Sequence, residues 1–359
     1  MRRSLRRALF VIMSSALVGG VAQANDNASG KGEMLADAKQ YLAKIAGDKG
    51  IGPREAATAS ETETANYIYD VLLSFGYQVE RQEFTVSFKK GAEKKTSQNI
   101  IAYKPGRSGK SLVLGAHYDS INAKAGSHGV IDNGASVAVM LSLAKHLSTQ
   151  PKSEDGIVFI AFGAEEVGLR GSRHFVNKLT TEEQQSFVGM INMDTIVGGD
   201  KLYIHSAHNK PYNCQGVPNN YRFDTSLRDE LLKVSKEVFG DDGYQLHPDY
   251  AGYPAGETGN WSDHAPFACA GMPVAYLEAT NFSIVGKDGN DGYSQSIHPK
   301  LWSCINEEKL SACDAKSEKK WGQIWHTGAD QLNFLNGLFP ERINQQMDKS
   351  LQLLSAYFE

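Results

Sequence analysis

The sequence predicts an α/β fold in which helices cover both faces of a mixed, largely parallel central sheet. From residue 111 onward, short apolar runs alternate with stretches of helical periodicity, the usual pattern of such a sheet. Before residue 111, two segments alternate between apolar and polar residues, so we expect an antiparallel edge there. No internal repeat and no Pro/Gly/Ser-rich linker divides the chain. We therefore expect one domain over residues 25–359.

Each expected element has its own pattern. In the helix expected over residues 61–75, apolar residues recur at helical spacing, and residues 78–88 alternate as a half-exposed strand does. The strands expected besides 78–88 are residues 99–103, 111–116, 156–162, 187–193, 202–204 and 273–277. The further helices expected are residues 34–45, 135–147, 169–178, 181–185, 226–239 and 340–358. Residues 281–325 are polar and long for a connection, and such loops often cover a binding site.

Residues 1–24 have the composition of a signal peptide. Four arginines precede a short apolar stretch over residues 8–18, and Ala22-Gln23-Ala24 offers a small-x-small cleavage site. The apolar stretch is too short to span a bilayer, which disfavours the alternative of a membrane anchor. The paired arginines hint weakly at twin-arginine export, but the general secretory route fits better. We expect a periplasmic or secreted protein.

Composition excludes some classes of partner. Without the four arginines of residues 1–24, the formal charge of −4 becomes about −8, and no basic stripe follows, which argues against a nucleic-acid binder. No later apolar stretch has the length of a membrane-spanning helix, so stable membrane insertion is not expected. The oligomeric state has no signature in the sequence.

The cysteines suit an oxidising compartment, where four of them allow three pairings if all are bridged. Cys304 and Cys313 lie close together in a polar loop, and we expect a disulfide between them. Cys269 lies in a small apolar segment, Ala-Cys-Ala, and we expect a buried free thiol there. None of the cysteines has zinc-finger spacing.

Glu165 and Glu166 are the most informative pair of residues. They follow the apolar run 157–162 and a small-residue turn, as reactive groups at the carboxyl end of a buried parallel strand do. A Glu pair taken alone is usually a solvated surface feature. Two adjacent acids at a site require a cation, or one of them must take up a proton.

Other candidate ligands follow similar strands and turns. His117 ends one apolar run, and Asp119 is placed to orient it, as carboxylates commonly orient ligating histidines. Asp132 precedes a small-residue turn and a helix, where taken alone it would be a capping or turn residue. Asp194 ends another strand, and His326 lies late in the chain with an acid four residues after it.

Together these segments place His, Asp, Glu, Asp and His along one edge of the sheet. Nitrogen and oxygen ligands without thiolates suit zinc, with manganese or cobalt as substitutes. Two histidines and three carboxylates exceed the usual set for one catalytic zinc. They fit two metal ions that share a bridging carboxylate, roughly 3.5–4 Å apart.

The ordered motifs resemble the bacterial dinuclear zinc aminopeptidases, a family of zinc exopeptidases that also includes relatives of the transferrin receptor. The resemblance covers roughly residues 60–355. It rests on residues 115–120, 132–133, 163–172, 192–194, 262–267 and 326–330. Residues 198–203, 278–282 and 286–289 carry a closer likeness to periplasmic aminopeptidases of the alkaline phosphatase isozyme conversion type. The likeness implies a three-layer α/β/α zinc-exopeptidase fold.

The resemblance also implies a role for each residue and two zinc ions per chain. It implies that Asp132 bridges both ions and that the Asp132–Asn133 peptide bond is cis. One zinc is completed by His117 and Asp194, and the other by Glu166 and His326. Glu165 is the general base, and Asp119 supports His117. The implied activity is hydrolysis of the N-terminal bond of peptides or exported proteins.

One position departs from the pattern. Some relatives have a Tyr before the last histidine, where its hydroxyl stabilises the oxyanion, but this chain has Trp325. Tyr118, Tyr276 and His264 are candidate replacements, and the zinc acting alone is the alternative.

The closer likeness suggests a preference for basic N-terminal residues, arginine in particular. Such a pocket would contain a carboxylate, for which Glu257, Asp263 and Glu278 are available, although acids are also common on surface loops. A carboxypeptidase specificity stays open within the same class of enzyme.

Two other functions compete with the aminopeptidase. One is a single-zinc acyltransferase like the glutaminyl cyclases, which the uninterrupted residues 163–172 disfavour because cyclases break that stretch. The other is a non-catalytic, receptor-like binding module, which the complete set of ligands and base disfavours.

Overall fold

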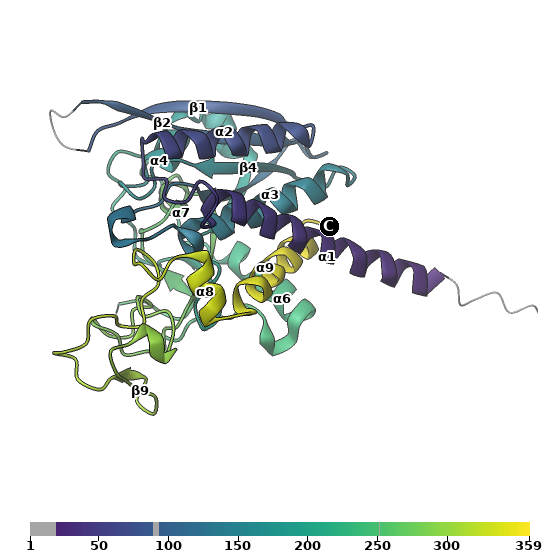
Figure 1. The fold of residues 1–359 in the computed structure, drawn as a ribbon. Coiled ribbons are helices and arrows are strands. Elements are labelled where there is room, and N and C mark those ends of the chain that lie inside the picture. The colour runs from purple at the N-terminus through teal and green to yellow at the C-terminus, as the bar shows by residue number, and fades with distance from the viewer. Residues whose placement is uncertain (1–18, 89–92, 251) are drawn as a thin grey trace, which may run out of the picture.

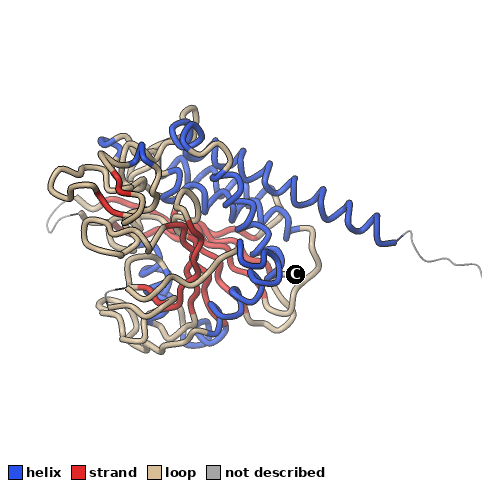
Figure 2. Tube along the Cα trace, turned by 90° about the horizontal axis from the view of Figure 1, so that it is seen from below, coloured by secondary structure: helices blue, strands red, loops and turns tan. Residues whose placement is uncertain are grey.

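The computed structural model describes residues 19–88, 93–250 and 252–359, with side chains from residue 32 onward. Within these residues, eight strands form one sheet in the order β1-β2-β4-β3-β5-β8-β6-β7. In chain order the strands are β1 (Gln78–Val86), β2 (Lys95–Lys104), β3 (Ser111–His117), β4 (Gly156–Phe162), β5 (Phe187–Met193), β6 (Lys201–Ala207), β7 (Glu257–Thr258) and β8 (Val274–Thr280). The sheet runs through the middle of the molecule with helices on either side (Figure 2).

Four strands at the centre of the sheet, β4, β3, β5 and β8, run parallel. The pairs β1/β2, β2/β4 and β6/β8 are antiparallel, so the antiparallel edge expected from the early strands is confirmed. The connections from β3 lead to β4 on one side and, after β4, to β5 on the other. This is a topological switch point, beside which α/β proteins bind their ligands.

Side chains of the central strands alternate between two apolar cores, as pleating requires. Leu112 and Leu114 belong to one core, whereas Val113 belongs to the other. The first core contains residues from α1 (Gly19–Ala46), α2 (Ala59–Ser74), α3 (Ala135–Ser148), α6 (Ser226–Phe239), α8 (Leu332–Leu338) and α9 (Arg342–Phe358). The second contains residues from α4 (Arg170–Lys178) and α7 (His264–Cys269). The three-layer α/β/α fold is therefore confirmed (Figure 1).

Each helix and strand expected from the sequence is present, including the short α5 (Thr181–Ser186), but several other short elements were not predicted. The strand expected to stop before Glu278 continues to Thr280, so Glu278 lies inside β8. The unpredicted elements are α7, α8, β7, β9 (Ile305–Asn306), β10 (Ser311–Ala312), η1 (Ala123–Ala125), η2 (Val130–Gly134), η3 (Gly240–Asp242) and η4 (Pro299–Leu301). Each is too short to show a period in the sequence.

The expected signal peptide lies largely outside the described residues, which begin at residue 19. Residues 19–24 form the first turns of α1, whose N-terminal half projects from the rest of the molecule (Figure 1). None of the described helices combines the length and apolar character needed to cross a membrane.

Two disulfides are present. Cys304 and Cys313 are bonded, which confirms the expected pairing. The expectation of a free thiol at Cys269 is wrong, because Cys269 is bonded to Cys214 across 55 residues. The end of α7 packs against the loop that follows Cys214, and the Asn220 N–H donates to the Cys269 carbonyl at 2.8 Å.

The loop over residues 281–325 is ordered by a buried carboxylate. Glu318 accepts hydrogen bonds from backbone N–H groups of Ser303, Cys304, Lys319, Lys320 and Trp321. Burial opposes ionisation of Glu318, yet these donors lower its pKa to about 2. A long connection with little regular structure thus has a defined shape around one side chain.

Candidate metal centre

Three parallel strands deliver side chains to one edge of the sheet. His117 is the last residue of β3 and pairs in register with Phe162, the last residue of β4. Glu165 and Glu166 follow β4 after a two-residue turn, and Asp194 follows β5 directly. Because the carboxyl ends of parallel strands meet at one edge, residues distant in sequence become neighbours.

Asp132 reaches this edge from η2, immediately before α3. The Asp132–Asn133 peptide bond is cis, as the resemblance implied. The Asn133 amide donates to the carbonyl of Met193 at 2.9 Å and accepts from the N–H of Thr195 at 3.2 Å. These two bonds tie the turn that carries Asp132 to the end of β5, on both sides of Asp194.

The two carboxylate oxygens of Asp132 face different histidines. Oδ1 lies 3.1 Å from His117 Nε2, which also lies 3.3 Å from Asp194 Oδ1. Oδ2 lies 2.9 Å from His326 Nε2, which also lies 3.2 Å from Glu166 Oε2. The five residues expected to bind metal are thus in one cluster, which divides into two halves that share Asp132.

The cluster has the donor chemistry and spacing of a metal site. Ligand atoms of His117, Asp132 and Glu166 lie within 4.8 Å of one another, and so do those of His117, Glu165 and Asp194. Glu166 Oε1 is buried and has no hydrogen-bond partner among the described residues. A buried carboxylate oxygen without a donor is costly unless a cation contacts it, so the residues present fit a bound metal.

The pKa values of the clustered residues also fit a bound metal. Burial opposes protonation of His326, yet its contacts with Asp132 and Glu166 raise its pKa to about 11. Burial also raises the pKa of Glu166 to about 8, with the charge of Asp132 contributing. Without metal, the cluster retains protons in order to reduce its negative charge. Binding of a metal ion displaces such protons, because the ligand atoms must be deprotonated to coordinate the metal.

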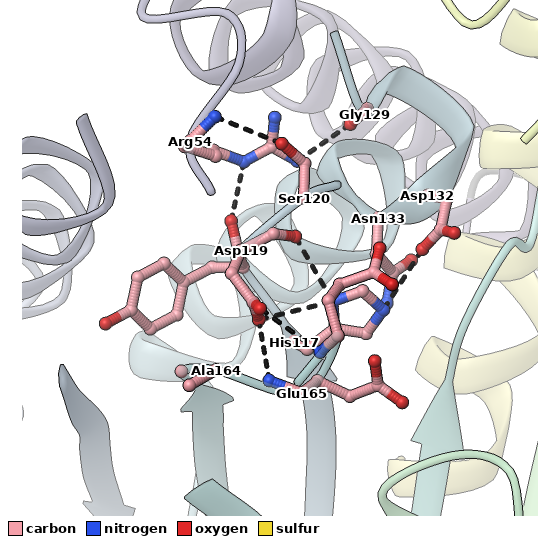
Figure 3. Close-up of polar contacts among 12 residues, drawn as sticks. Arg54, His117, Asp119, Ser120, Gly129, Asp132, Asn133, Ala164 and Glu165 are labelled. Carbon is pink, nitrogen blue, oxygen red and sulfur yellow. Dashed lines mark hydrogen bonds and ion pairs between the residues drawn. The ribbon is translucent and has the colours of Figure 1, made fainter. Parts of the chain in front are cut away.

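Asp119 lies against both the first histidine and the turn after β4, and its backbone carbonyl is 3.2 Å from His117 Nδ1. Its carboxylate accepts the N–H of Glu165 at 2.9 Å (Figure 3). It also accepts the N–H of Glu166 at 3.2 Å. The same carboxylate lies 3.6 Å from His117 Nδ1. The side chain is fully buried, so it holds two neighbouring segments in a fixed relation.

Ser262 has a role that sequence reasoning missed. Its hydroxyl donates to Asp194 Oδ2 at 2.7 Å and accepts from the Asn192 amide at 2.8 Å. These two hydrogen bonds fix the orientation of Asp194, as the hydrogen-bond partners of metal-binding carboxylates commonly do. Its sequence signal was present, because Ser262 begins the segment 262–267 noted for its family resemblance.

Beside the cluster, a cavity opens with aromatic and acidic walls. Besides Glu165 and the five clustered residues, its lining consists of Trp261, Tyr276, Glu278, Phe282, Asp291, Tyr293 and Trp325. Four of these residues come from the 281–325 loop, so the expectation that this loop covers a binding site fits the structure. Asp291 and Tyr293 had no recognisable signal in the sequence, because their position depends on the path of that loop.

Of the three acids considered for a basic pocket, only Glu278 lines the cavity. The Glu257 carboxylate is engaged elsewhere, at 2.7 Å from His208 Nδ1 and 2.8 Å from the N–H of Asn209. Asp263 is fully buried outside the lining.

The candidate oxyanion donors also differ in whether they line the cavity. Tyr276 lines the cavity. The hydroxyl of Tyr118 donates instead to the carbonyl of Gln98 at 2.7 Å, and His264 Nε2 lies 2.8 Å from the carbonyl of Gly259. Neither Tyr118 nor His264 belongs to the cavity wall.

Several curated proteins are similar to this chain. The alkaline phosphatase isozyme conversion protein of Escherichia coli (strain K12) is 28% identical over 256 residues, which cover 66% of this chain and 70% of that protein. Aminopeptidase YwaD of Bacillus subtilis (strain 168) is 32% identical over 204 residues, or 55% of this chain and 38% of that protein. The alignment thus spans less than two thirds of the second relative.

Solved structures share the fold. A zinc aminopeptidase from Bacillus subtilis aligns with a TM-score of 0.63 and 17% identity, over 90% of this chain and 95% of that one. A glutaminyl cyclase from Porphyromonas gingivalis aligns with a TM-score of 0.60 and 17% identity, over 91% and 97%. At such identities the likeness shows the fold alone.

The family model described as Peptidase family M28 matches residues 99–349, which is more than half of the chain and includes the whole cluster. The metallopeptidase class expected from the sequence is thereby confirmed. The chain belongs to peptidase family M28.

Proposed function

We propose that this chain is an aminopeptidase with two zinc ions that removes N-terminal residues from peptides or exported proteins. The observation that carries the proposal is the placement of Asp132, with one oxygen 3.1 Å from His117 and the other 2.9 Å from His326. A carboxylate shared in this way suits two neighbouring metal ions. His117 and Asp194 would complete one site, and Glu166 and His326 the other.

Glu165 is the proposed general base. Bound zinc would lower the pKa of a water molecule and polarise the scissile carbonyl. Burial and the charges of Glu166 and Asp194 raise the pKa of Glu165, while His117 opposes them. A carboxylate with raised proton affinity beside the cluster is suited to accept a proton from water and pass it to the leaving amine.

Cleavage at the N-terminus requires hydrogen-bond acceptors in the cavity that bind the free α-amine of the substrate. Glu165 and Asp194 both line the cavity and can accept hydrogen bonds from a substrate ammonium group. Tyr276 is the proposed donor to the oxyanion, because it lines the cavity and carries a hydroxyl, which Trp325 lacks.

A preference for basic N-terminal residues is supported by two acids in the cavity wall. Glu278 and Asp291 lie there among aromatic rings, which also attract cations. Glu278 lies 3.0 Å from His205, but burial lowers the pKa of that histidine to about 3, so His205 is neutral. Burial raises the pKa of Glu278 to about 8, and a cationic side chain would favour its ionised form.

The cyclase alternative uses the same fold, and structural likeness does not separate the two. The two-part cluster around Asp132 favours two metals over one. A receptor-like module is disfavoured because the complete cluster and Glu165 line a cavity.

Export is proposed from the leader-like residues 1–24, with residues 25–359 as the catalytic domain. The two disulfides support it, because such bonds persist in oxidising compartments.

Turnover of aminoacyl-p-nitroanilides tests the proposed activity. The purified mature protein should hydrolyse substrates with a free amine, lose activity with chelator and regain it with zinc. N-acetylated substrates serve as the control and should not be hydrolysed. Hydrolysis of both forms at similar rates would contradict the aminopeptidase, and cyclisation of N-terminal glutamine without hydrolysis would favour the cyclase.

A further inference from the structure

Arg54 is fully buried, and within the described residues each hydrogen bond of its guanidinium group goes to a backbone carbonyl. It lies in the connection between α1 and α2, outside residues 99–349 that match the family model. The guanidinium donates to the carbonyls of Gly52 (3.1 Å), Tyr118 (2.6 Å), His128 (2.7 Å) and Gly129 (2.7 Å). Within the described residues no carboxylate forms an ion pair with it. A buried cation without a paired acid is unusual and calls for a reason.

The carbonyls belong to the two segments that carry His117 and Asp132. Tyr118 stands between His117 and Asp119, directly after β3. Gly129 lies in the turn that leads into η2 and Asp132 (Figure 3). One rigid planar group therefore connects the end of β3 to the turn before the shared carboxylate, and its geometry sets their separation.

The turn before Asp132 is also held by a second buried side chain, that of Asp330. Asp330 Oδ1 accepts the N–H groups of Val130 at 2.9 Å and Ile131 at 2.8 Å. Arg54 thus holds the carbonyls of this turn while Asp330 holds its N–H groups. The peptide groups that place Asp132 are therefore bonded on both their C=O and N–H atoms by two buried side chains.

The backbone around Arg54 is fixed to the same loop. The Arg54 N–H donates to Ser120 Oγ at 3.0 Å, and the Ser120 N–H donates to the Arg54 carbonyl at 3.3 Å. Gly129 provides the space, because a Cβ there would lie 2.5 Å from that of Ser120 and 3.1 Å from Arg54 Nη1. Its φ of +62° also favours glycine.

The charge of Arg54 suits a site rich in acids. Burial lowers its pKa to about 10, while the charges of Asp330, Asp119, Asp132 and Glu166 oppose the shift, so the group stays cationic at neutral pH. Four of its five N–H donors are used on carbonyls, so it offsets the negative charge without binding a ligand oxygen. A lysine has neither the planar fork nor the number of donors to reproduce these contacts.

We infer that Arg54 is a positioning residue for metal binding, which holds His117 and Asp132 at the separation that lets one carboxylate serve both halves of the cluster. The inference rests on the metal site of the proposed function. Its test does not depend on any peptide substrate.

The test compares Arg54→Met and Arg54→Lys with wild type in the full mature protein. Zinc affinity is measured by competition with a chromophoric chelator, and ligand geometry by the visible absorption of the cobalt-substituted protein. Both are recorded well below the melting temperature, with folding checked by circular dichroism. Both variants should bind zinc at least about tenfold more weakly and show an altered cobalt spectrum, as is typical when a ligand's support is lost.

The matched control is Arg228→Met. Arg228 also donates to a carbonyl, that of Gly256 at 3.1 Å, and its other hydrogen bonds in the described part of the chain go to Ser206 and Asp229, which are outside the cluster. This control should retain the wild-type zinc affinity and spectrum even if it is less stable. The inference is overturned if a folded Arg54 variant has the zinc affinity and the cobalt spectrum of wild type. It is also overturned if the control weakens zinc binding equally, or if neither Arg54 variant folds with zinc in excess. Failure of the proposed function would appear instead in wild type, as a lack of zinc binding or of turnover.

Discussion

The carboxylate of Asp119 accepts the backbone N–H of Glu165 at 2.9 Å and lies 3.6 Å from His117 Nδ1, so one residue lies against both the first histidine and the proposed base. The turn after β4 cannot shift without disturbing the end of β3. This coupling makes the effects of single substitutions predictable, because metal binding and proton transfer depend on the same buried group.

Glu165→Gln should separate metal binding from catalysis. The amide keeps the shape of the side chain but cannot accept a proton from water, so the turnover number should fall by about 10²–10⁴-fold. Zinc content, measured by atomic emission on the same sample, should stay at the wild-type value. Turnover within tenfold of wild type would show that another group is the base.

Asp119→Asn should weaken both metal binding and catalysis. One carboxylate oxygen becomes an N–H₂ group that faces the N–H of Glu165 or Glu166, so an acceptor is lost next to a donor. Zinc affinity should fall about 10–100-fold, with activity falling in parallel. Chelator competition and steady-state kinetics measure the two effects. Unchanged zinc affinity would contradict the supporting role.

Glu278→Gln should reduce the preference for basic residues. Loss of the carboxylate removes a charge-assisted contact, so the ratio of kcat/KM for Arg over Leu p-nitroanilides should fall about tenfold or more. Glu257→Gln is the matched control, since that carboxylate is engaged by His208 and Asn209 outside the cavity. A ratio that falls equally in both variants, or in neither, would rule out Glu278 as the specificity group.

The two disulfides should contribute unequally to stability. Replacing Cys214 and Cys269 by serine opens a bridge across 55 residues, whereas the Cys304–Cys313 bridge closes only 9. Because longer loops lose more entropy on closure, the first double variant should lose about 3–5 kcal/mol of unfolding free energy and the second about 1.5 kcal/mol less. Urea denaturation measures both. A larger loss from the second pair would contradict this order.

The strands at the site could be predicted because each is a continuous apolar run that ends in a polar residue. The stretches before His117 and Glu165 are buried on both faces of the sheet, and their sequence reflects that burial. The order of motifs along the chain then predicted which ligands would meet at one edge of the sheet. The five clustered residues needed no information beyond the strand ends and the family resemblance.

The remainder depends on contacts that no local pattern records. Arg54 meets Tyr118 across 64 residues, and Cys214 meets Cys269 across 55, so neither pair has a signal in its neighbouring sequence. The apolar neighbours of Cys269 reflect burial in α7, and burial is as typical of a disulfide as of a free thiol. Asp291 joins the cavity wall through the path of a long loop, which side-chain contacts determine.

Anomalous diffraction at the zinc absorption edge, from crystals grown with zinc, tests the central claim most directly. Two peaks are expected roughly 3.5–4 Å apart, one beside each oxygen of Asp132. The first should contact His117 and Asp194, and the second Glu166 and His326. A single peak, or two peaks that do not share Asp132, would contradict the two-zinc centre.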